Sequence, residues 1–219
     1  MIKTLLKLLP YILMTIILCF LIILGFFFYL SYQSLPNYNK SLFSTDIKSK
    51  IIIKTDSHAV PHISGKNDKE TFLGLGYVHA RERLWQMTYL KRLSQGRLSE
   101  ISGQENVILD SFMKSLDLQG LSNQIFQNLP RDLQQVLSFY SKGINLRLKE
   151  IQEQGLGRGS PEFFFYSPEV TPWSPIDSLA IFKLIEFMSS NKALAEIELT
   201  TLLFSNINEK RLNHLIIDS

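Results

Sequence analysis

The hydrophobic positions form one uninterrupted block near the N-terminus and are spaced more widely after it. No charged residue occurs between Lys7 and Lys40, and the segment from Ile12 to Leu30 is almost wholly apolar. A helix rises about 1.5 Å per residue, so roughly 20 apolar residues cover the ~30 Å hydrocarbon core of a bilayer. Backbone polar groups in lipid must be satisfied within the segment. The pattern therefore predicts a transmembrane helix.

The charges that flank this block predict its orientation. Lys3 and Lys7 precede it, and no acidic residue does. The positive-inside tendency places the N-terminus in the cytoplasm and the chain from Ser34 onward in the periplasm or cell exterior. A cleaved secretory signal is the alternative, but its apolar core spans about 7–15 residues and ends at small residues. Because this block is longer and ends in bulky aromatics, we favour an uncleaved signal-anchor; a buried soluble helix is the third interpretation.

The remaining pattern predicts a helical region with one short strand pair. We expect residues 1–33 to form a cytoplasmic tip and membrane anchor, residues 34–49 a polar linker, and residues 50–219 the helical region. The expected elements are strands at Ile51–Ile53 and Val60–Ile63, and helices at Asp68–Leu93, Asp110–Leu121, Pro130–Ile151 and Pro175–Asn191, the last resuming to Phe204.

Smaller signals refine these boundaries. Asp68 is the expected N-cap of the first long helix, Gly74 and Gly76 predict a kink or break in it, and Gln95-Gly96 predicts its end. The glycine-rich segment 155–160 and the proline-rich segment 161–175 predict loops without regular structure.

Composition narrows the classes of partner and site. The formal net charge is only +3, and no basic stripe with interleaved aromatics occurs, which argues against nucleic acid as a partner. The single cysteine, Cys19, falls within the predicted membrane helix. The region after the anchor therefore has no intrachain disulfide, no cysteine metal site and no cysteine nucleophile.

Five segments of this region, read in order, resemble the N-terminal (α-chain) region of the penicillin acylase family. The most specific is the Gly-x-Gly-Tyr-Val-His-Ala-Arg-Glu-Arg-Leu-Trp-Gln-Met run from Gly74 to Met87. The others are Asp56–Ile63, Gly96–Gly103, Phe139–Asn145 and Pro161–Ser178. The resemblance covers about residues 50–206.

The resemblance implies a fold and a division of labour. The fold would be the α-chain part of an αββα N-terminal-nucleophile hydrolase, with most of the sheets missing from this chain. Catalysis in the family belongs to a β chain, whose N-terminal Ser attacks an amide carbonyl with its own α-amino group as base. This chain would then hold no catalytic residue and be inactive alone. Ser160 and Ser190 lie in sequence contexts that only superficially resemble the family's Gly-Ser junction.

The resemblance also implies two contributions from the α chain. Residues near the end of this chain would line the acyl pocket at positions that correspond to Met188, Ser189 and Ser190. Penicillin G-type members have Arg-Phe there, so the serines put a phenylacetyl preference in doubt. Glu196 matches a carboxylate that binds structural calcium, with the other oxygen ligands on the β chain. A solvated helix acid is the alternative for Glu196.

Most other prominent residues of the matched segments have structural interpretations. Tyr77, Leu84, Trp85 and Met87 are expected to pack in the core, and Trp173 to anchor an irregular segment. Glu82 and Arg83 are adjacent and do not face each other on a helix, so each needs a partner elsewhere if it is buried. His62 and His79 have no companions at metal-ligand spacing, which favours packed histidines.

Together these features predict part of a membrane-anchored amidohydrolase of linear amides, such as the N-acyl side chains of β-lactams, acyl-homoserine lactones or lipopeptides. Its expected partners are the membrane, a β chain and a small amide substrate. The alternatives are a non-enzymatic remnant or membrane-tethered interaction module, and a helical scaffold unrelated to acylases. The reading frame downstream discriminates between them.

Overall fold

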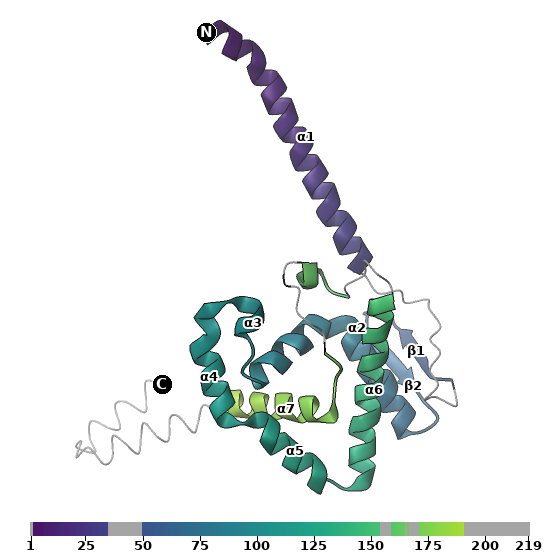
Figure 1. The fold of residues 1–219 in the computed structure, drawn as a ribbon. Helices are drawn as coiled ribbons and strands as arrows, with labels where there is room; N and C mark the ends of the chain where they lie inside the picture. Colours follow the sequence, from purple (N-terminus) through teal and green to yellow (C-terminus); the bar gives the residue numbers. More distant parts are fainter. Residues whose placement is uncertain (1, 35–49, 154–158, 165, 167–170, 191–219) are drawn as a thin grey trace, which may run out of the picture.

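The computed structural model describes residues 2–34, 50–153, 159–164, 166 and 171–190. Its first element, α1 (Ile2–Ser34), projects from the body of the molecule (Figure 1). Residues Pro10–Tyr32 of α1 are long and apolar enough to cross a membrane, and none of that stretch is buried. This agrees with the predicted helix over Ile12–Leu30, by length and composition. The linker at 34–49 falls outside the described residues from position 35 onward.

The body begins with the expected strand pair. Strands β1 (Ile52–Thr55) and β2 (Pro61–Ser64) are antiparallel, with Ile53 opposite Ile63. The Asp56 carboxylate fixes the turn between them, because its Oδ1 accepts the backbone N–H groups of His58 and Val60, each at 2.9 Å. The pair lies beside α2, which β2 contacts.

Helices α2 (Asp68–Ser94) and α6 (Arg131–Glu153) form the centre of the body. The N-cap of α2 is Asn67, one residue before the predicted Asp68; its side chain accepts the N–H of Glu70 at 3.1 Å. The helix ends at Gln95 and Gly96 as predicted, and Gly96 has a positive φ of 61°.

The predicted kink near Gly74 and Gly76 is wrong. The non-helical residue of α2 is Arg83 (φ −134°, ψ 23°). Gly74 instead makes room for the Ile63 side chain of β2, and Gly76 lets two backbones approach, since a Cβ there would lie 2.0 Å from the Tyr140 carbonyl oxygen of α6. Gly143 of α6 makes the reciprocal approach, with the Leu73 carbonyl oxygen 1.9 Å from where its Cβ would be. Gly74 and Gly76 therefore reflect close packing against α2 and not a weakness of the helix.

Two shorter predictions also need correction. The helix predicted over Asp110–Leu121 is two helices, α4 (Val107–Leu116) and α5 (Leu118–Asn128), separated by Asp117 in the left-handed conformation (φ 44°). Asp117 then caps α5 by accepting the Gly120 N–H. The proline-rich segment contains one short 3-10 turn, η2 (Pro161–Phe164). The remaining short elements are α3 (Ser99–Ser102) and η1 (Gln104–Asn106).

The last described helix, α7 (Pro175–Ser189), packs along α5 and touches α2 and α6 (Figure 1). Ser174 and Asp177 form a capping box at its start, with Pro175 in the first turn. Two apolar clusters result. The first joins α2, α6 and the irregular segment through Ala80, Leu84, Ile144, Leu148, Phe163 and Trp173. The second joins the ends of α2, α4, α5 and α7 through Leu93, Leu98, Met113, Leu118, Ala180 and Leu184.

The core predictions are confirmed for the matched segments. Tyr77 and Leu84 are buried, and Trp85 and Met87 pack against the first cluster while remaining partly accessible. Trp173 is buried and pins its segment to α6: Asn145 accepts its backbone N–H at 2.7 Å and donates to its carbonyl at 2.8 Å.

Candidate functional site

The sequence-predicted acyl pocket falls at the C-terminal end of α7. Met188 and Ser189 are the last two residues of the helix, and Ser190 is its C-cap. The Ser190 N–H and hydroxyl both donate to the Phe187 carbonyl, at 3.2 and 2.8 Å. All three predicted residues are exposed, and the Met188 side chain is 56% accessible. The structure thus brings them together on one surface; whether they line a pocket stays a prediction.

Large apolar side chains surround this helix end. Phe112 of α4 and Phe187 of α7 have ring centroids 6.1 Å apart. Ile108, one turn before Phe112, is 84% exposed. We use the name α4–α7 surface for the exposed apolar side chains of these two helices, of which Phe112 and Phe187 are in contact: Ile108, Phe112, Phe182, Ile185, Phe187 and Met188. Such a concentration of exposed apolar side chains marks interaction sites in soluble proteins.

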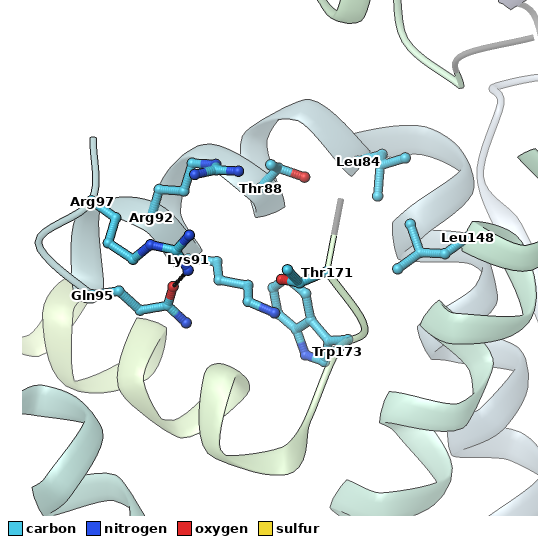
Figure 2. A pocket seen from close by; sticks show the side chains of 9 residues that line it. All are labelled: Leu84, Thr88, Lys91, Arg92, Gln95, Arg97, Leu148, Thr171 and Trp173. Carbon is cyan, nitrogen blue, oxygen red and sulfur yellow. Dashed lines mark hydrogen bonds between the residues drawn. The ribbon is translucent and has the colours of Figure 1, made fainter. Parts of the chain in front are cut away.

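A second candidate is a small pocket between α2 and the segment that precedes α7 (Figure 2). Its polar lining is cationic. The Lys91 ammonium lies 3.1 Å from the Asp177 carboxylate, 2.8 Å from the Pro172 carbonyl oxygen and 5.3 Å from the centre of the Trp173 ring. The full lining is Leu84, Thr88, Lys91, Arg92, Gln95, Arg97, Leu148, Thr171 and Trp173.

The contacts of the pocket's cations are structural. Arg92 and Arg97 both pair with Glu100, and the hydrogen bond from Arg97 is the main reason that the pKa of Glu100 lies below its usual value. Gln95 donates to Asp177 at 3.1 Å, which joins the end of α2 to the start of α7. These side chains therefore hold the helices together at this point, and we assign the pocket no catalytic role.

The two histidines that the sequence singled out, His62 and His79, are both exposed and not packed in the core. His62 pairs with Asp56 across the hairpin at 3.0 Å, and this hydrogen bond lowers the pKa of Asp56. The Nδ1 atom of His79 hydrogen-bonds with the Tyr140 hydroxyl at 2.9 Å, and desolvation lowers the pKa of His79. Within the described ranges, no three His, Cys, Asp or Glu side chains are grouped to hold a metal ion.

A buried polar group joins α2 to α6. The Tyr77 hydroxyl donates to Glu150 at 2.9 Å, and Arg147 donates to the same carboxylate oxygen at 2.8 Å. Burial, followed by the contact with Glu150, raises the pKa of Tyr77. Glu82 and Arg83, by contrast, are exposed, and Glu82 accepts from its neighbour Arg81 at 2.7 Å. The bonds that Tyr77 and Arg147 make to Glu150 thus cross-link α2 and α6.

Ser160 and Glu196 are the remaining residues that the sequence singled out. The Ser160 hydroxyl hydrogen-bonds with Glu162 in the η2 turn. Glu196, the predicted calcium ligand, lies outside the described residues. Sequence reasoning missed Asp110, whose carboxylate accepts the backbone N–H groups of Leu98 and Ser99 at 2.7 and 2.8 Å. No spacing rule links a helical Asp to a turn that precedes it by a dozen residues, so only the structure reveals this contact.

Comparison with known proteins identifies the region that carries these features. The sequence model of the penicillin amidase family matches residues 50–218. The chain belongs to the penicillin amidase family. Its match begins at the first residue of the body that the structure describes and takes in every element from β1 to α7.

Named relatives of this penicillin amidase family chain include two kinds of acylase. The acyl-homoserine lactone acylase QuiP of Pseudomonas fluorescens (strain Pf0-1) is 28% identical over 164 residues, which are 75% of this chain and 20% of the relative. Penicillin acylase 2 proenzyme of Pseudomonas sp. (strain SE83) is 27% identical over 153 residues, 68% of this chain and 19% of the relative. The chain thus spans about a fifth of the length of these curated relatives.

A solved structure supports the fold. The chain is similar to a thermostable penicillin G acylase from Alcaligenes faecalis, with a TM-score of 0.60 and 20% sequence identity. The likeness covers 76% of this chain and 88% of that chain. The mainly helical architecture with one short strand pair is therefore that of a segment found in penicillin acylases.

Proposed function

We propose that residues 50–219 are the α-chain-like part of a membrane-anchored amidohydrolase that hydrolyses the carbon–nitrogen bond of linear amides. The observation that carries the proposal is the family match over 50–218, together with relatives named as acylases of acyl-homoserine lactones and of penicillin. The substrates would be N-acyl compounds of this kind. The complete fold would be the αββα sandwich of N-terminal-nucleophile hydrolases.

The proposed chemistry divides between two chains. A β chain supplies an N-terminal Ser, which attacks the amide carbonyl while its α-amino group takes the hydroxyl proton. The present chain contributes no catalytic group. It supplies the wall of the acyl pocket through Met188, Ser189 and Ser190. Their exposure at the end of α7 supports this role, because a partner can reach them.

The β chain is proposed to cover the α4–α7 surface. The exposed apolar side chains there supply the driving force for association, at about 25 cal/mol for each Å² of apolar surface removed from water. Met188 belongs both to this surface and to the proposed acyl-pocket residues, so a β chain seated on the surface would reach it. Calcium bound by Glu196 and β-chain oxygens would strengthen the same junction.

The proposed location follows from α1. The lysines that precede its apolar stretch place the N-terminus in the cytoplasm and the body in the periplasm or cell exterior. Mass spectrometry of the membrane fraction tests the anchor, because a cleaved signal would remove the N-terminal residues. A mature protein that starts after Leu30 would replace the signal-anchor by a signal peptide and leave the enzymatic proposal intact.

The decisive experiment begins with the reading frame downstream of Ser219. An open frame that encodes a Gly-Ser junction and a long β chain is expected. The product of the complete frame should release free carboxylic acid from an N-acyl-homoserine lactone or a penicillin, and residues 1–219 alone should not. Ser→Ala at the junction is the matched inactive control. A decayed frame would instead support a non-enzymatic remnant.

A further inference from the structure

An aromatic group lies where α2 meets η2, apart from the α4–α7 surface. Trp85 of α2 is its centre. The Tyr166 ring stacks on Trp85 with centroids 5.2 Å apart and an angle of 22°, and the Phe163 ring meets Trp85 edge-on at 5.6 Å. Tyr89, one turn further along α2, is 6.5 Å from Trp85. We call these four residues the aromatic face.

The members of the aromatic face differ in exposure. Phe163 is buried and Trp85 is half-buried, whereas Tyr89 and Tyr166 are 37% and 44% exposed. The inner rings fix the geometry, and the outer tyrosines present an apolar ring with a polar hydroxyl. Tyr and Trp side chains of this amphipathic kind are enriched where protein meets the interfacial layer of a membrane.

The place of η2 in the molecule favours a membrane as the partner. Helix α1 contacts η2, and Figure 1 shows η2 beside the end of α1, on the side of the body that faces it. The stretch that can cross a membrane ends at Tyr32, two residues before α1 ends. The headgroup layer beyond the hydrocarbon core is roughly 5–8 Å thick on each side. A turn in contact with α1 near its exit from the bilayer therefore lies at the depth of the headgroups.

We infer that the aromatic face is a second membrane contact, in which Tyr89 and Tyr166 enter the headgroup layer of the bilayer that α1 crosses. This inference rests on the proposed anchoring by α1. The stack of Trp85 on Tyr166 transmits the contact to α2, so the body is held in one orientation against the membrane.

The two tryptophans of the chain allow a direct test. Trp85 belongs to the aromatic face, and Trp173 is buried in the first apolar cluster. The full chain is reconstituted into phosphatidylcholine nanodiscs with ordinary or brominated acyl chains, since bromine quenches tryptophan emission at short range. The parent chain and Trp85→Phe are compared, so that their difference reports Trp85 alone.

We expect bromine to reduce the emission of the parent chain and to leave that of Trp85→Phe nearly unchanged. Equal emission of the parent in the two kinds of nanodisc would overturn the inference. So would quenching of Trp85 by aqueous acrylamide to the level of a free side chain, or shielding from both quenchers, which would indicate cover by protein. Failure of the chain to enter nanodiscs at all would instead contradict the anchoring.

A charge variant tests the outer tyrosine without touching Trp85. Tyr166→Asp should diminish the quenching by brominated lipid, because a carboxylate is costly to place in the interface. The matched control is Leu133→Asp, which also replaces an exposed large apolar side chain but lies at the start of α6, at the end of the body away from α1 (Figure 1). Equal quenching in the two variants would overturn the role of Tyr166. Circular dichroism of both variants checks that the body is folded.

Discussion

Helices α2 and α6 meet with their backbones in contact, whereas α4 and α7 carry large apolar side chains that face solvent. At the α2–α6 interface, a glycine on each helix faces a carbonyl of the other, and buried Tyr77 and Glu150 form a hydrogen bond across the junction. On the α4–α7 surface, by contrast, the side chains of Ile108 and Met188 are mostly exposed to solvent. The body thus contains one closely packed interface, between α2 and α6, and one exposed apolar surface, on α4 and α7.

The difference shows which part of the body is fully packed and which part gains stability from a partner. Interiors are close-packed, so an interface whose backbones touch tolerates no added atom. A surface that leaves phenylalanine and isoleucine in water is stable only at the cost of solvating them, and it gains by being covered. The α2–α6 interface is therefore expected to govern the stability of the body, and the α4–α7 surface its associations.

The largest expected effect on the free energy of unfolding comes from adding one carbon to the α2–α6 interface. In Gly143→Ala, the new Cβ would lie 1.9 Å from the Leu73 carbonyl oxygen, so the two helices must separate. Overpacking costs about 1–3 kcal/mol when side chains can adjust, and we expect roughly 3 kcal/mol or more against backbone. Urea denaturation of the full chain in non-ionic detergent, followed by circular dichroism, measures the change.

The matched control for this variant is Gly25→Ala in α1, where a Cβ would meet nothing within 4 Å. It should leave the denaturation midpoint of the body unchanged. If Gly143→Ala behaved like this control, the α2–α6 interface would not be the closed junction that the comparison requires.

A smaller loss is expected where the irregular segment joins α6. Asn145 accepts from and donates to the backbone of Trp173, and Asn145→Ala leaves both backbone groups without these partners. Unsatisfied buried polar groups cost about 1–3 kcal/mol each, and partial hydration should reduce the total to roughly 2 kcal/mol. The same denaturation experiment measures it, and Trp173 emission should shift to longer wavelength. An unshifted emission with full stability would show that Asn145 does not hold this segment.

Acid should weaken the turn that leads from α2 to α4. Burial acts to raise the pKa of Asp110, but hydrogen bonds from Ser99 and Leu98 outweigh it and set the pKa below the ordinary 3.8. A carboxylate with a lowered folded pKa stabilises fully above its unfolded pKa, and this contribution is lost as pH falls through the folded value. The free energy of unfolding should therefore decline below about pH 4. Asp110→Asn, which keeps one acceptor oxygen, should cost roughly 1 kcal/mol at neutral pH and show a weaker decline in acid.

Much of this architecture could be predicted from the sequence because local chemistry determines it. The apolar block predicted α1, the β-branched run predicted β1, and Gln95-Gly96 predicted the end of α2. Each of these signals lies within a few residues of the element that it predicts.

The features that escaped prediction depend on residues distant in the sequence. Gly76 reads as a weak helix position until Tyr140 is placed opposite it, and Asp110 reads as an ordinary helix acid until Leu98 lies beneath it. The candidate site shows the same limit. Only the resemblance points to Met188, Ser189 and Ser190, and their exposure at the end of α7 depends on how the helices pack.

The smallest effect on stability, and the sharpest test of the comparison, is expected on the α4–α7 surface. Ile108→Ser and Met188→Ser remove apolar side chains that are already mostly in water, so each should change the free energy of unfolding by less than about 0.5 kcal/mol. Their effect should appear in association instead. Residues 50–219 produced without α1 are expected to self-associate or aggregate through this surface, and the paired serine variant should stay monomeric to higher concentration in analytical ultracentrifugation. Leu184→Ala is the control within α7, because its buried side chain belongs to the second apolar cluster and its loss should cost about 2–5 kcal/mol. If the serine variants destabilised the chain as much as Leu184→Ala does, the α4–α7 surface would be part of the closed core, and the contrast with α2 and α6 would disappear.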